Sequence, residues 1–142
     1  MPPVWLIAAI VAAWMLSGLV PGWGFGTWAA YAGPILVLAA LGIMLVAVME
    51  FNRAKTTIIP RNQPHALISS GVYRYSRNPI YLADAMLLCG LILRWEAVLA
   101  LPLVPIFAWV IRKRFITGEE LRLAEVFPVE FEAYRSRTRR WI

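Results

Sequence analysis

The stretch WAAYAGPILVLAALGIMLVAVM, Trp28–Met49, contains no charged side chain and is long enough to cross a membrane. A membrane-spanning helix needs about 20 successive apolar residues. Val4–Val20 is a second apolar stretch of marginal length, and Pro21–Gly26 separates the two. No Lys or Arg precedes the first stretch and no small-residue cleavage site follows it, so we interpret it as a retained helix and not as a secretory signal. Residues 4–49 therefore predict two spans.

Two shorter apolar runs follow, Pro79–Leu93 and Ala97–Ile111. At about 1.5 Å per residue each helix would be roughly 22 Å long, short of a bilayer core of about 30 Å. Residues 79–111 thus predict either two shortened spans or a helical hairpin that enters the bilayer without crossing it. Pro102 and Pro105 lie inside the fourth run and should kink it.

The composition of the whole chain supports a membrane protein. Of its 142 residues, 61% are apolar and only 15% are charged, against about 25% in an ordinary soluble domain. Too few polar groups are present to cover the core of a soluble globule, and the length allows one domain, residues 1–142. One cysteine, Cys89, and one histidine leave no basis for a disulfide or a metal site. We predict an all-α, multi-pass membrane protein with about four membrane helices.

The basic residues are distributed unequally between the loops. The polar loop over 50–78 contains five Lys and Arg residues, and the segment over 112–142 contains eight. On the opposite side, the turn Pro21–Gly26 contains none and the turn between the third and fourth apolar runs contains one, Arg94. The positive-inside rule places the basic segments, and with four spans both termini, in the cytoplasm. Such residues also attract anionic membrane lipids. Nucleic acid is not an expected partner, because no groove-reading or base-stacking element accompanies the charge.

The polar loop ends in HALISSGVYRYSRNPIYL, His65–Leu82, which holds three tyrosines, two arginines and the only histidine. An ordinary juxtamembrane turn would explain each feature separately, with arginines at the lipid head groups and tyrosines at the interface. Pro79 would then be the first residue of a helix. The density of hydrogen-bonding groups exceeds what anchoring requires, and this favours a binding site.

A second cluster, RKRFITGEEL, covers Arg112–Leu121. Thr117 and Glu120 have the spacing of a capping box, in which Glu120 closes the start of a helix. Glu119 is not needed for such a cap, although the helix dipole favours a carboxylate there in any case. The amphipathic pattern over 112–142 predicts two short helices against the cytoplasmic face, the second starting at Pro128.

Together these motifs resemble the isoprenylcysteine carboxyl methyltransferase family, which is itself similar to the phospholipid N-methyltransferases. The pattern is H-x-L-x-x-x-G-x-Y-R-Y-x-R-N-P-x-Y-L, then E-E-x-x-L and F-x-x-Y, within His65–Ile142. The resemblance implies methyl transfer from S-adenosyl-L-methionine, without a Rossmann domain, to a lipophilic acceptor such as an isoprenylcysteine-type carboxylate at the cytoplasmic face. A phospholipid amine is the alternative acceptor. A non-catalytic scaffold that binds anionic lipid is the alternative class of protein.

The resemblance also implies a set of cofactor-binding residues. They are His65, Ala66, Leu67, Ile68, Tyr73, Asn78, Pro79, Ile80, Tyr81 and Glu119. Asn78 stands where many members have histidine, which removes a titratable group from this position. Phe115 stands where some members have a substrate-binding arginine, and the adjacent Arg114 is the candidate replacement.

Physical chemistry assigns roles to these residue types independently. A carboxylate such as Glu119 can hold the amine or the ribose hydroxyls of the cofactor, and tyrosine faces attract its sulfonium. Arg77 can pair with the cofactor's carboxylate. We therefore predict Arg77, Glu119 and Glu120 as catalytic residues. If the acceptor is an amine, His65 or Glu120 is the expected proton acceptor, whereas a carboxylate acceptor needs none.

Asp84 is a carboxylate inside the third apolar run. Carboxylates within a membrane are rare and usually functional, so Asp84 is a candidate for contact with the substrate. The structural alternative is an ion pair with Arg77 or with Arg112–Arg114. The sequence does not decide between them.

Overall fold

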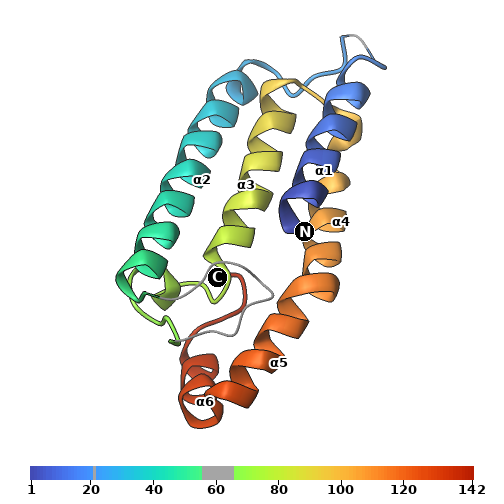
Figure 1. The fold of residues 1–142 in the computed structure, drawn as a ribbon. Helices are drawn as coiled ribbons and strands as arrows, with labels where there is room; N and C mark the ends of the chain where they lie inside the picture. Colours follow the sequence, from blue (N-terminus) through green and yellow to red (C-terminus); the bar gives the residue numbers. More distant parts are fainter. Residues whose placement is uncertain (21, 56–65) are drawn as a thin grey trace.

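The computed structural model describes residues 1–20, 22–55 and 66–142, and every regular element in these ranges is a helix or helical turn. Figure 1 shows the longer helices side by side, with α5 and α6 at one end of them. The elements are α1 (Pro2–Ser17), α2 (Thr27–Arg53), η1 (Gly71–Arg74), α3 (Pro79–Arg94), η2 (Val98–Ala100), α4 (Leu103–Ile111), the π-helical η3 (Arg112–Ile116), α5 (Thr117–Val126) and α6 (Pro128–Arg137). The all-α prediction is confirmed for the described residues.

Prolines mark the starts of several helices. Pro79 is the first residue of α3, as predicted, because its fixed φ angle and missing N–H suit a first turn. Pro128 starts α6, also as predicted. The fourth apolar run is interrupted and is not one kinked helix, because it forms η2, a turn that contains Pro102, and then α4. Pro102 precedes α4 and Pro105 lies in its first turn, where no intrahelical hydrogen bond is lost.

Among the described helices, α2 is the one that is long and apolar enough to cross a membrane. Several of its large apolar side chains are exposed, among them Tyr31, Ile35, Leu38 and Leu45. An apolar surface of this kind is unfavourable in water and is compatible with lipid. The helix α1 is apolar as well, but it has only 16 residues. The structure therefore supports one candidate span, and the total of four spans stays a prediction.

The helices α2 and α3 pack through small residues. A Cβ atom on Gly33 would lie 2.7 Å from the Gly90 carbonyl oxygen, and one on Gly90 would lie 2.8 Å from the Gly33 carbonyl oxygen. Small residues allow such close approach of two backbones and are typical of helix pairs in membranes. Ala29, Ala40 and Ala47 continue the buried side of α2. This packing holds α3, whose first turn carries part of the predicted site.

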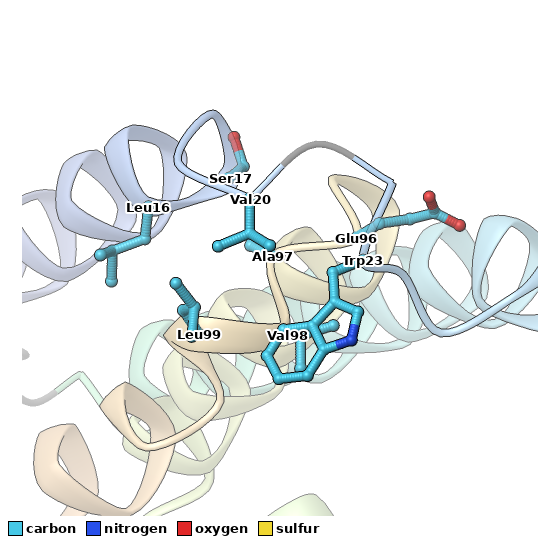
Figure 2. Close-up of a pocket in the computed structure, with 8 residues that line it drawn as sticks. All are labelled: Leu16, Ser17, Val20, Trp23, Glu96, Ala97, Val98 and Leu99. Atoms are coloured by element: carbon cyan, nitrogen blue, oxygen red, sulfur yellow. The ribbon is translucent and has the colours of Figure 1, made fainter.

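Different elements lie at the two ends of the helical bundle. The turn before α2 and the turn between α3 and α4 lie at one end, whereas η1, α5 and α6 lie at the other (Figure 1). Figure 2 shows a small pocket at the first end, formed by the end of α1 and the two turns. Its lining residues are Leu16, Ser17, Val20, Trp23, Glu96, Ala97, Val98 and Leu99. None of the predicted site residues lines this pocket.

Candidate functional site

A tyrosine and a glutamate connect the first turn of α3 with the first turn of α5. The Tyr81 hydroxyl donates a hydrogen bond to Glu119 Oε1 at 2.6 Å, a length typical of a bond to a charged acceptor. Burial raises the pKa of the Glu119 carboxyl, and the hydrogen bond from Tyr81 opposes this in part. Both residues are predicted cofactor ligands, and the fold brings them into contact across 38 positions of sequence.

A second set of polar contacts joins α5 to the C-terminal segment and to the residues just before α3. Glu120 accepts two hydrogen bonds from Arg140, from Nε at 3.1 Å and from Nη2 at 2.7 Å. On the same carboxylate, Glu120 Oε1 lies 3.2 Å from Arg77 Nη1. Two guanidinium groups therefore share one carboxylate, which leaves positive charge in excess. We call Arg77, Glu120 and Arg140 the charged cluster.

Arg77 keeps hydrogen-bonding capacity inside this cluster. Its side chain is only 10% exposed, yet Nε and Nη1 have no hydrogen-bond acceptor among the described residues. A buried donor without an acceptor costs about 1–3 kcal/mol, and more if it is charged. Native proteins leave few such groups unpaired, and the exceptions are often at functional sites. The arrangement suits an anionic group bound beside Arg77.

The predicted capping box at Thr117 and Glu120 was wrong. The chain passes from α4 through η3 into α5 with helical backbone angles at Ile116, so no new helix begins there that needs a cap. The Thr117 hydroxyl donates instead to the Arg112 carbonyl oxygen at 3.0 Å. Short π-helical turns inside longer helices are frequent at functional sites. Glu120 is thereby available to the charged cluster.

The C-terminal segment, residues 134–142, is tied to the loop before α3. The Tyr134 hydroxyl donates to the Tyr73 carbonyl oxygen at 2.6 Å. Asn78 Nδ2 donates to the Arg140 carbonyl oxygen at 3.2 Å. Sequence reasoning missed Arg140, because basic residues beside membrane helices are common and no local pattern distinguishes this one. The site therefore depends on a segment that returns from the far end of the chain.

Glu50, near the end of α2, is a second residue that sequence reasoning missed. Its Oε2 accepts a hydrogen bond from the Ser70 hydroxyl at 2.6 Å, and its Oε1 lies 3.3 Å from Arg53 Nη1. Gly71, which follows Ser70, has a φ of +58°, and a Cβ atom there would lie 2.7 Å from Glu50 Cδ. Only glycine suits that turn. The one available signal was that Glu50 is the first charged residue after the apolar stretch.

The other predicted cofactor ligands mostly have packing roles. Four of them belong to one apolar cluster between α2 and α6, namely Leu67, Ile68, Tyr73 and Ile80. Burial raises the pKa of the Tyr73 hydroxyl far above its usual range, so it stays neutral. Pro79 is fully buried and Ala66 is half-buried. His65 lies outside the described residues, so its predicted role is not tested.

The two predicted substrate contacts have different surroundings. Arg114 is exposed, and its guanidinium carbon lies 5.3 Å from the centroid of the Trp5 ring of α1, a cation–π contact. Asp84 is buried in the second turn of α3. Of the ion pairs within the described ranges, none joins Asp84 to Arg77 or to Arg112–Arg114. The structural alternative for Asp84 is therefore not supported.

The two polar contacts meet on α5, where Glu119 and Glu120 are neighbours, and they include groups of both charge signs. Glu119 offers a carboxylate to a cation or to hydroxyl groups, and Arg77 offers unpaired N–H groups to an anion. No group of three or more His, Cys, Asp or Glu that could hold a metal ion occurs in residues 1–20, 22–55 and 66–142.

This fold and site agree with a comparison of the chain with known families. The chain belongs to the phospholipid methyltransferase family, whose model matches residues 28–130. That family includes the isoprenylcysteine carboxyl methyltransferase-like proteins, so the resemblance seen in the sequence is confirmed. Its members are methyltransferases. No curated protein and no solved structure matches the chain. The matched range includes Tyr81 and Glu119 but ends before Arg140.

Proposed function

We propose that the protein is an S-adenosyl-L-methionine-dependent methyltransferase that methylates a lipophilic acceptor at the cytoplasmic face of a membrane. The observation that carries the proposal is the buried Arg77, whose Nε and Nη1 have no hydrogen-bond acceptor among the described residues. Its ion-pair partner Glu120 follows Glu119, which is bonded to Tyr81, in the first turn of α5. The amino-acid part of the cofactor has one carboxylate and one ammonium group. A guanidinium and a carboxylate on the protein complement these two charges.

In this proposal each side chain has a separate task. Arg77 binds the carboxylate of the cofactor, and Glu119 binds its amine or its ribose hydroxyls. Tyr81 orients Glu119 through the 2.6 Å hydrogen bond. When bound, the cofactor supplies a methyl group on a cationic sulfur. Because methyl transfer is an in-line displacement, the protein accelerates it mainly by aligning the acceptor with that methyl group.

The acceptor that best agrees with this site is a carboxylate of the isoprenylcysteine type. A carboxylate has no proton to lose when it is methylated, so no general base is needed. Both oxygens of Glu120 already accept hydrogen bonds from Arg140, which leaves Glu120 poorly placed to remove a proton. The second candidate is a phospholipid amine, which the description of the matched family favours. It needs a proton acceptor, for which His65 is the remaining candidate.

A labelled-methyl assay tests the function and separates the two acceptors. The full-length protein is first titrated with S-adenosylhomocysteine, then incubated with methyl-labelled S-adenosylmethionine and with prenylated cysteine, phospholipid or thiol acceptors. We expect binding of S-adenosylhomocysteine and label in a base-labile methyl ester, whereas an N-methyl product would resist base. Absence of binding, together with adsorption to anionic vesicles, would support the non-catalytic scaffold instead.

We also propose a multi-pass topology with four membrane insertions and both termini in the cytoplasm. Single cysteines at Trp23 and Arg94, on a Cys89→Ala background, should react with a membrane-impermeant maleimide from outside the cell. Single cysteines at Asn52 and Arg139 should react only after permeabilisation. The expectation follows from the excess of basic residues in the loop and in the tail. Labelling of residue 52 from outside would contradict a cytoplasmic site.

A further inference from the structure

Arg77 and Arg140 share the single carboxylate of Glu120. Arg140 forms the stronger, forked contact, through Nε at 3.1 Å and Nη2 at 2.7 Å. Arg77 is within ion-pair distance, at 3.2 Å, but Nη1 forms no hydrogen bond with acceptable geometry. Arg140 therefore occupies the hydrogen-bonding positions of Glu120 that Arg77 would otherwise use.

The burial of the two arginines is the reverse of what a simple ion pair predicts. The Arg77 side chain is 10% exposed, whereas the Arg140 side chain is 34% exposed. Buried charges are normally the ones that are paired, because desolvation is costly for them. Here both guanidinium groups lie within ion-pair distance of the carboxylate, but only the more exposed one hydrogen-bonds to it. Nε and Nη1 of the more buried one have no hydrogen-bond acceptor among the described residues. This distribution is unfavourable unless Arg77 has another anion to bind.

The same C-terminal segment also holds the backbone around Arg77. The Arg77 amide donates to the Arg139 carbonyl oxygen at 3.0 Å, and Asn78 Nδ2 donates to the Arg140 carbonyl oxygen at 3.2 Å. These bonds hold the backbone of Arg139 and Arg140 beside Arg77 and Asn78. They involve main-chain carbonyl oxygens, so they persist when the Arg139 or Arg140 side chain is replaced.

We propose that Arg140 is a positioning residue that occupies both oxygens of Glu120 with hydrogen bonds. Arg77, although only 3.2 Å from Glu120 Oε1, thereby keeps N–H groups for the carboxylate of an amino-acid-bearing cofactor. The proposal rests on the function proposed above. It adds that cofactor binding depends on a residue beyond the range that the family model matches. Without Arg140, both Glu120 oxygens become available to Arg77, and the excess positive charge of the cluster is lost.

Two ligands that differ in one part test this role. S-adenosylhomocysteine contains the amino-acid part, whereas 5′-methylthioadenosine contains the adenosine and lacks that part. In full-length Arg140→Met, titration should show S-adenosylhomocysteine binding weakened by about 10-fold or more, as for a lost charge-assisted hydrogen bond. Binding of 5′-methylthioadenosine should not change. Arg139→Met, which removes the same charge from an exposed neighbour, should bind both ligands as the parent does.

A double variant separates positioning from simple support of the fold. In Glu120→Gln/Arg140→Met the competing carboxylate is gone, so affinity for S-adenosylhomocysteine should rise above that of Arg140→Met. Arg140→Lys retains the positive charge but not the forked guanidinium. Its affinity for S-adenosylhomocysteine should lie between those of Arg140→Met and the parent. If Arg140→Met weakens the binding of both ligands equally, or if the double variant does not regain affinity for S-adenosylhomocysteine, the role of Arg140 is overturned while the proposed function stands. A parent protein that binds neither ligand would overturn the proposed function and this proposal with it.

Discussion

Replacing Glu119 with glutamine should weaken the binding of S-adenosylhomocysteine by about 10- to 150-fold. A charge-assisted hydrogen bond contributes about 1.5–3 kcal/mol, and about 1.4 kcal/mol corresponds to a tenfold change in affinity. The amide oxygen of glutamine can still accept the hydrogen bond from Tyr81, so the contact between α3 and α5 should survive. Isothermal titration measures the affinity, and a thermal melt in the same detergent checks the fold.

The control is Glu125→Gln, which removes the same charge from an exposed position of α5. It should leave the affinity unchanged. A pH series gives a second readout, because burial raises the pKa of the Glu119 carboxyl. Affinity of the parent should fall as the pH decreases through that raised pKa, whereas affinity of Glu119→Gln should not follow this titration. If Glu119→Gln binds as tightly as the parent, Glu119 is not a cofactor ligand.

Replacing Gly33 with alanine should lower the free energy of unfolding by about 1–3 kcal/mol, the usual cost of overpacking a close contact. The new Cβ atom would lie 2.7 Å from the Gly90 carbonyl oxygen and 2.8 Å from the Arg94 amide nitrogen. Both are backbone atoms, so no side-chain rotation relieves the clash. The helices α2 and α3 must separate near Gly33 and Gly90.

Gly42→Ala is the matched control, because Gly42 lies on the same helix and a Cβ atom there meets nothing within 4 Å. Alanine is favoured over glycine inside a helix by about 0.5–1 kcal/mol. The melting temperature should therefore fall for Gly33→Ala and rise or stay constant for Gly42→Ala. Equal melting temperatures for the two variants would contradict the close approach of α2 and α3.

The residue types of the candidate site were predictable, but their pairing was only partly so. Tyr81 and Glu119 share a family motif, and the fold brings them into contact as a common site requires. For Glu120, a predicted catalytic residue, local spacing indicates a cap with Thr117. Its true partner, Arg140, lies 20 positions further along the chain. A local pattern reports on contacts within one helical turn and contains no information about a segment that folds back.

By itself, the sequence determined where the apolar helices lie and which segments are basic. The lengths of apolar runs and the counts of Lys and Arg are local properties, and helix formation in these runs follows from them. Only the tertiary structure decided that Gly33 meets Gly90 and that Arg77 and Arg140 share Glu120. These contacts join residues that are distant in the chain, so they depend on how the helices pack and where the C-terminal segment docks.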